Sequence, residues 1–174
     1  MTFFYYMMLT VFTSYIAFIW IKYGVQRSIS DSYYRLPKSL QPLFTFFCWG
    51  FGLPAIIVGT TLTDAPWMFL AGAGICFVGV AAEFKKKLTK TVHMAGAYGG
   101  VALSQLAICI NFKMWYLTVG FVIIAGILQI INHYNKKFKT CVWWQEILAF
   151  ITIIIVFTVN LFPNVLEFIK NIFI

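Results

Sequence analysis

The chain contains very few charged residues: Asp, Glu, Lys and Arg make up 10% of its 174 residues, whereas 61% are hydrophobic. A soluble domain is about 45–50% apolar and about 25% charged. One small core cannot hide so much apolar surface, so we expect the lipid bilayer to be the solvent. The length leaves no room for a separate soluble domain, and we expect residues 1–174 to form a single transmembrane helical domain.

Paired cysteine motifs are also missing. The chain has four cysteines, none of them in a CxxC pair, and each lies inside or beside an apolar run. They are Cys48, Cys76, Cys109 and Cys141. This distribution is typical of thiols that pack as small apolar side chains.

Six apolar runs can be marked, each close to the about 20 residues that a helix needs to cross a hydrocarbon core about 30 Å thick. The expected spans are residues 3–21, 42–61, 67–84, 92–110, 114–132 and 142–162. Helices are predicted because the alternating ten-residue segments of a barrel are absent. No basic segment precedes the first run and no small-residue cleavage site follows it, so we expect it to remain as the first helix.

We therefore predict an all-α fold, an integral membrane bundle of six transmembrane helices. Apolar and polar residues alternate at helical spacing in the tail "PNVLEFIKNIFI". That pattern predicts a short C-terminal helix lying on the membrane interface.

Acidic residues are rarer than basic ones. The chain has five Asp and Glu residues and 13 Lys and Arg residues, which gives a net charge of +8. Eleven of the 13 basic residues fall in the loops between the first and second, third and fourth, and fifth and sixth runs. The positive-inside rule puts these loops in the cytoplasm and both termini outside, in an inner (cytoplasmic) membrane. Anionic inner-leaflet lipids account for the charge, and no nucleic-acid partner is expected.

Small residues recur at helical spacing in the third and fourth runs. The third run carries Gly72, Cys76, Gly79 and Glu83, and the fourth carries His93, Ala97, Gly100 and Ser104. Small residues let helix backbones approach closely in lipid. We expect these two stripes to face one another, which would bring Glu83 and His93 together near the cytoplasmic surface.

Three of the five acidic residues and both histidines fall at one membrane face in this topology. They are Asp31, Glu83, His93, His133 and Glu146. Such residues at membrane depth mark functional sites by default, although the cost is smaller at helix ends. The structural alternative is that Glu83 and Glu146 pair with nearby lysines and that His93 lines the interface.

Two kinds of chemistry fit this set. His93 and His133 with Glu83 and Glu146 could hold a divalent metal such as zinc, although no HxxxH or HxxE spacing supports it. Ser30 or Ser32 beside Asp31, with His93 as base, is the set available for nucleophilic catalysis, and Glu83 is a further catalytic candidate. The alternative for "SISDSYY" is a loop that caps a short helix through Ser30 or Asp31.

The segments "SISDSYYRLP", "FLAGAGICFVGVAAEFK" and "VHMAGAYGG" resemble a group of small, uncharacterised polytopic membrane proteins of bacteria and their phages, a resemblance that implies no activity. The Ser30, Asp31 and His93 set is more distantly similar to the membrane hydrolase superfamily of alkaline ceramidases and adiponectin-type receptors. Those proteins use a further HxxxH-type pair in their last helix, and the sixth run here has no histidine.

The function expected from the sequence is a polytopic membrane protein with an ionisable pocket facing the cytoplasm, with a lipid-directed hydrolase as the enzyme hypothesis. A small channel or transporter is the alternative. A third possibility is a non-catalytic regulatory protein that forms a homo-oligomer or binds another membrane protein through its glycine faces.

Overall fold

The structure is a computed structural model that describes residues 1–83, 87–135 and 139–164. Its helices are α1 (Thr2–Tyr23), the 3-10 helix η1 (Ser30–Tyr34), α2 (Pro42–Thr63), α3 (Pro66–Val80), α4 (Lys87–Ile110), α5 (Trp115–Tyr134) and α6 (Cys141–Leu161). No strand occurs in these described ranges, so the predicted all-α class is confirmed. The predicted interfacial helix falls largely on residues 165–174, which lie outside the described part.

Five helices of the described chain are long and apolar enough to cross a membrane: α1, α2, most of α4, α5 and α6. α3 is shorter, with 15 residues. At 1.5 Å per residue it covers about 22 Å, less than a full hydrocarbon core. The architecture is therefore that of a helical membrane bundle.

The boundary between α3 and α4 differs from the expected one. α3 ends at Val80 instead of continuing to residue 84, and α4 begins at Lys87 instead of residue 92. Ala81 is the C-cap of α3, and the His93 ring nitrogen Nδ1 lies 3.1 Å from its carbonyl oxygen. The last carbonyls of a helix lack intrahelical partners, so this contact favours an early end of α3. Two of the expected loop lysines, Lys87 and Lys90, thus belong to α4.

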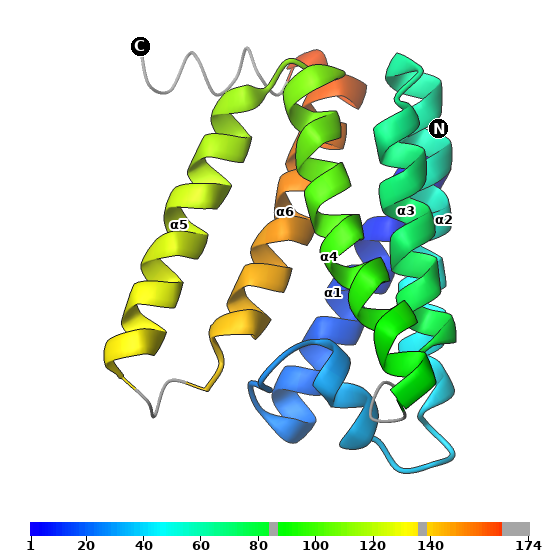
Figure 1. Cartoon of the computed structure of the whole chain (residues 1–174). Coiled ribbons are helices and arrows are strands. Elements are labelled where there is room, and N and C mark those ends of the chain that lie inside the picture. Colours follow the sequence, from blue (N-terminus) through cyan, green and yellow to red (C-terminus); the bar gives the residue numbers. More distant parts are fainter. Residues whose placement is uncertain (84–86, 136–138, 165–174) are drawn as a thin grey trace.

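The connection between α1 and α2 and the first turns of α4 and α6 lie at one end of the bundle, at the bottom of Figure 1, and the N-terminus lies toward the other end. The N-terminal turn of α1 packs on the C-terminal turn of α6, where the Tyr5 hydroxyl lies 2.7 Å from Thr158 Oγ1. The charge asymmetry read from the sequence is therefore also an asymmetry of the folded bundle.

Glycines bring α2, α3 and α4 into close contact. A Cβ on Gly74 of α3 would lie 2.9 Å from the Gly96 carbonyl oxygen of α4, so only glycine permits this approach. The predicted tight packing of α3 on α4 is therefore present, but it uses a different face of α3. A Cβ on Gly72 would lie 2.7 Å from the Gly52 carbonyl oxygen, so the stripe that contains Gly72 packs on α2.

Aromatic side chains join α1, α2 and α6. Tyr15 of α1 stacks on Phe47 of α2 with ring centroids 4.5 Å apart. Phe150 of α6 meets Phe51 of α2 edge-on, also at 4.5 Å. Large rings can fill the space between these helices, and their many dispersion contacts take the place of the close backbone contacts that the glycines allow.

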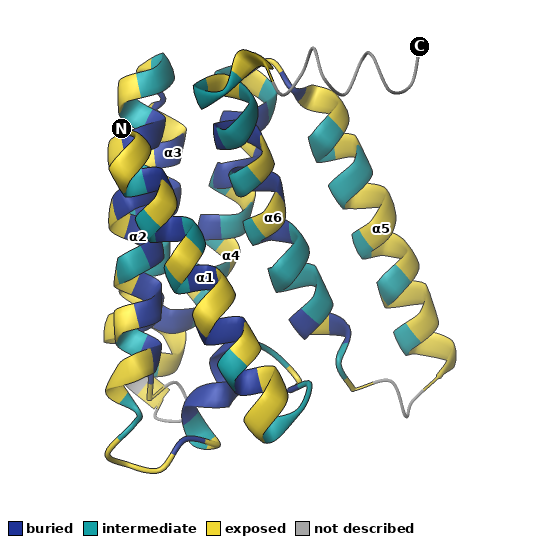
Figure 2. Cartoon of the chain, turned by 180° about the vertical axis from the view of Figure 1, so that it is seen from behind, coloured by how far each residue is buried: buried dark blue, intermediate teal, exposed yellow. Residues whose placement is uncertain are grey.

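α5 differs from every other long helix because none of its residues is buried. Figures 1 and 2 show it at the outer edge of the bundle beside α6, with only exposed and partly buried residues. Its apolar side chains suit contact with lipid.

Candidate functional site

The loop between α1 and α2 folds back against the basic end of the bundle. Its residues Ile29, Ser30, Ser32 and Leu36 are buried, and Asp31 is 9% exposed. The Ser32 hydroxyl lies 2.7 Å from the Tyr15 hydroxyl, which ties η1 to α1. A loop this polar is stable inside the protein only because its groups find partners.

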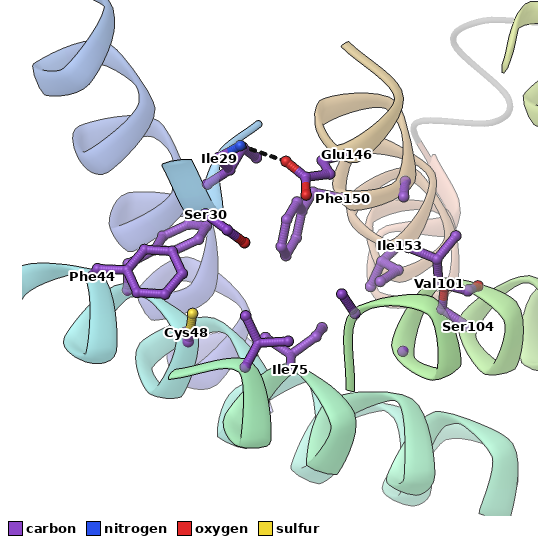
Figure 3. Close-up of a pocket in the computed structure, with 15 residues that line it drawn as sticks. Ile29, Ser30, Phe44, Cys48, Ile75, Val101, Ser104, Glu146, Phe150 and Ile153 are labelled. Atoms are coloured by element: carbon purple, nitrogen blue, oxygen red, sulfur yellow. Dashed lines mark hydrogen bonds between the residues drawn. The ribbon is translucent and has the colours of Figure 1, made fainter. Parts of the chain in front are cut away.

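The start of α6 holds the same loop. The Trp143 backbone N–H, one of the first-turn donors that a helix leaves unpaired, donates to the Arg27 carbonyl at 3.0 Å. One turn further along α6, Glu146 Oε2 accepts a hydrogen bond from the Ile29 backbone N–H. Figure 3 shows the Glu146 carboxylate reaching from α6 to the loop.

Below this contact lies a pocket between the loop and helices α2, α3, α4 and α6 (Figure 3). Its cavity volume is about 60 Å³. Apolar side chains dominate its lining, and the polar contributors are Ser30, Cys48, Ser104 and Glu146. We call it the Glu146 pocket. A mostly apolar cavity with a few convergent polar groups is the usual form of a small-molecule site.

The structure places two of the sequence-predicted residues in this pocket. Ser30 and Glu146 both contribute to the lining. Asp31 follows Ser30 but pairs with Arg27, whose Nε lies 3.2 Å from Asp31 Oδ2. The Ser28 hydroxyl accepts from the Asp31 backbone N–H at 3.0 Å.

The two histidines lie elsewhere. His93 is 2% exposed and caps α3 through the Ala81 carbonyl. A carbonyl only accepts, so Nδ1 carries the proton in this contact. His133 is exposed at the end of α5, where its ring meets Tyr134 edge-on at 5.3 Å. Neither histidine lines the Glu146 pocket.

Glu83 is exposed at the connection between α3 and α4, and its carbonyl accepts from the Thr89 hydroxyl at 2.5 Å. Its expected convergence with His93 stays a prediction. Across the described ranges, no three His, Cys, Asp or Glu side chains are grouped so that they could hold a metal ion. The metal site suggested by the sequence therefore stays a prediction.

Three polar side chains deeper in the bundle donate hydrogen bonds, two of them to another helix. Gln105 Nε2 of α4 donates to Thr152 Oγ1 of α6 at 2.9 Å. Gln145 Nε2 of α6 donates to the Ala125 carbonyl of α5 at 3.0 Å. Asn160 Nδ2 donates within α6 to the Val156 carbonyl at 2.8 Å. These contacts account for three polar residues of the apolar runs without a transport path.

Sequence reasoning found Glu146 because it is an acid in an apolar run, but it missed the walls of the pocket. Phe44, Phe47, Ala97, Ala149 and Phe150 come from three helices and share no motif. Their apolar character does not distinguish them from lipid-facing residues, so no signal in a single sequence could have selected them.

The fold and the pocket together define the class: a polytopic, all-helical membrane protein with an apolar cavity at the basic end of its bundle. The chain matches no protein-family model, no curated protein and no solved structure. The resemblances to small bacterial membrane proteins and to membrane hydrolases therefore stay predictions.

Proposed function

We propose that this membrane protein binds a small apolar or amphiphilic molecule in the Glu146 pocket. The observation that carries the proposal is the pocket itself, a cavity of about 60 Å³ with a lining that is almost entirely apolar. That volume is smaller than the about 300–1,000 Å³ of pockets that enclose a drug-sized molecule, so we expect the pocket to take one end of the ligand. Binding by this site requires no catalytic group.

Hydrolysis is not proposed, because the candidate residues have separate partners. Ser30 lines the pocket, Asp31 pairs with Arg27, and His93 bonds to the Ala81 carbonyl. A nucleophile needs its base within about 2.6–3.2 Å, and the base needs an orienting group. No contact of this kind between Ser30 and His93 is part of the described structure.

The Glu146 pocket lies in the half of the bundle that carries the basic connections. We place this half on the cytoplasmic side of an inner membrane, with both termini outside, because basic loops remain in the cytoplasm. A ligand would then enter from the cytoplasmic leaflet, where anionic lipids meet the lysines of the loops.

The topology is tested with two reporters fused separately after Ile174. A reporter that works only in the cytoplasm should be silent there, and one that works only outside should be active. The reverse pair of results would move the pocket to the outer leaflet.

Binding is tested by photolabelling the full chain in nanodiscs with a neutral, diazirine-bearing decanol, followed by peptide mapping. Label should concentrate on the pocket segments of α4 and α6. Ala97→Phe would fill the cavity, since Ala97 is part of its lining. Its matched control is Ala95→Phe, two residues away on an exposed position of α4.

We expect Ala97→Phe to lower labelling of the α6 pocket segment at least fivefold and Ala95→Phe to leave it unchanged. Monodisperse gel filtration of both variants excludes unfolding as the cause. Equal labelling of the α6 segment in both folded variants would show that the cavity takes up no ligand.

A further inference from the structure

Resting on the proposed function, we propose that the Glu146 pocket selects molecules that carry a cationic nitrogen on an apolar body. The Glu146 carboxylate would supply the counter-charge, and the aromatic walls would surround the nitrogen. This assigns the chemical class of the ligand, which the cavity volume alone does not.

The first argument is that one oxygen of the Glu146 carboxylate, Oε1, forms no hydrogen bond in the described structure. Glu146 Oε2 accepts from the Ile29 N–H, as the dashed line in Figure 3 shows. Across residues 1–83, 87–135 and 139–164, no hydrogen bond to Oε1 is formed. A carboxylate can accept at both oxygens, so Oε1 remains available to a donor that enters the pocket.

The second argument is the lack of a positive partner. Arg27 pairs with Asp31, and within the described ranges no lysine or arginine forms an ion pair with Glu146. A carboxylate in apolar surroundings loses hydration, and a paired cation compensates for that loss. An ammonium group bound at Oε1 would provide this pairing.

The third argument is the composition of the walls. Phe44, Phe47 and Phe150 line the pocket, and Figure 3 shows the Phe150 ring beside the Glu146 carboxylate. Aromatic ring faces attract cations, most strongly where water is excluded. The aliphatic residues Ile75, Val101 and Ile153 complete the lining and suit the apolar body.

The experiment compares two photoprobes in nanodiscs that hold the full-length protein. One is the neutral diazirine-bearing decanol, and the other is the same chain with a trimethylammonium group in place of the hydroxyl. The test variant is Glu146→Gln, whose amide oxygen still accepts from the Ile29 N–H but carries no charge. The control is Asp64→Asn, an acid-to-amide change at an exposed turn after α2.

In the wild type we expect the ammonium probe to label the pocket segments at least tenfold more efficiently than the neutral probe. Asp64→Asn should keep that preference. Glu146→Gln should bring the two probes to within about twofold, while labelling by the neutral probe persists and shows that the pocket is intact.

Three other outcomes would each contradict a different claim. Equal labelling by both probes in the wild type would mean that Glu146 serves only to hold the loop. A preference that survives Glu146→Gln would place the cation elsewhere. If neither probe labels the pocket above the level on α5, the binding function itself fails.

The cationic nitrogen could belong to a free amphiphile or to a lipid headgroup, and a competition arm separates these sources. Phosphatidylethanolamine is added to the nanodiscs, or unlabelled decyltrimethylammonium is added to the solution. Protection by the lipid assigns a lipid headgroup, whereas protection by the soluble ammonium alone assigns a free amphiphile. Protection by neither would contradict a cation-selective site.

Discussion

Gly74 of α3 and Gly96 of α4 have surroundings opposite to those of the glycines in α5. A Cβ on Gly96 of α4 would lie 2.7 Å from the Gly74 carbonyl oxygen of α3. A Cβ on Gly120 or Gly126 of α5 would meet nothing within 4 Å. In lipid there is no hydrophobic force between helices, so close backbone packing is a main source of association. The same residue type therefore fixes one part of this bundle and leaves another part open.

The bundle therefore divides into two parts: a tightly packed body, made of α1, α2, α3, α4 and α6, and one attached helix, α5. α2, α3 and α4 meet through glycine, and aromatic rings add α1 and α6 to them. α5 buries no residue. Every helix that lines the Glu146 pocket belongs to the body, so its walls are held in place by tight contacts. A preorganised cavity loses less free energy on binding than one that must be ordered.

The strongest way to break the comparison is to place the same side chain at both kinds of glycine. Gly96→Leu should destabilise the protein by about 3 kcal/mol or more, because its side chain would overlap the backbone of α3. Gly126→Leu should be neutral or gain up to about 1 kcal/mol from helix propensity, because a Cβ there meets nothing within 4 Å. The folded fraction of each variant after heating in detergent, compared with the wild type, measures these two changes in stability. Similar losses in the two variants would contradict the division between body and attached helix.

A subtler pair tests which face of α3 meets which neighbour. Gly72→Ala should cost about 1–3 kcal/mol, because its Cβ would approach the Gly52 carbonyl of α2 too closely. At Gly100 the nearest atom to a new Cβ is the Ala71 carbonyl oxygen at 3.4 Å, an ordinary contact. Gly100→Ala should therefore be neutral or gain up to about 1 kcal/mol from helix propensity. Chemical unfolding measures the free energy of unfolding of both variants. A larger decrease for Gly100→Ala than for Gly72→Ala would contradict the packing of the Gly72 stripe on α2 and favour the predicted contact with α4.

The smallest effect is expected where α5 joins α6. Gln145→Leu removes the hydrogen bond from Nε2 to the Ala125 carbonyl and the one that Oε1 accepts from Gln129 Nε2. Such interhelical bonds in membranes average about 0.6 kcal/mol each, so global stability should fall by about 1 kcal/mol. Ile151→Leu, an exposed change on the same helix, serves as the control. A loss of several kcal/mol for Gln145→Leu would show that α5 is an essential part of the body.

Much of the architecture follows from the sequence because the bilayer constrains it strongly. Apolar runs of about 20 residues must be helices in lipid, and Pro42 and Pro66 fit the first turns of α2 and α3. The end of α3 could not be predicted, because it depends on His93 reaching the Ala81 carbonyl from another helix. The sequence also did not predict that Gly72 packs on α2. A stripe of small residues shows that a helix can pack closely, but it does not show which helix packs against it.

The candidate site was predicted only in part. An acid inside an apolar run identified Glu146 without its partner, the Ile29 N–H, which lies 117 residues away in the chain. Ser30 was identified for its possible nucleophilic role, whereas its clear structural feature is its place in an apolar wall. A cavity is formed by the space between helices, and a single sequence contains no direct record of that space.

The most direct test of the central claim, that the body holds a binding pocket, is the concentration dependence of labelling by the neutral decanol probe. Label on the pocket segments of α4 and α6 should saturate, because one cavity holds a limited number of molecules. Label on α5 should rise in proportion to probe concentration, as expected for a surface in contact with lipid. Linear labelling on all three helices would contradict the account.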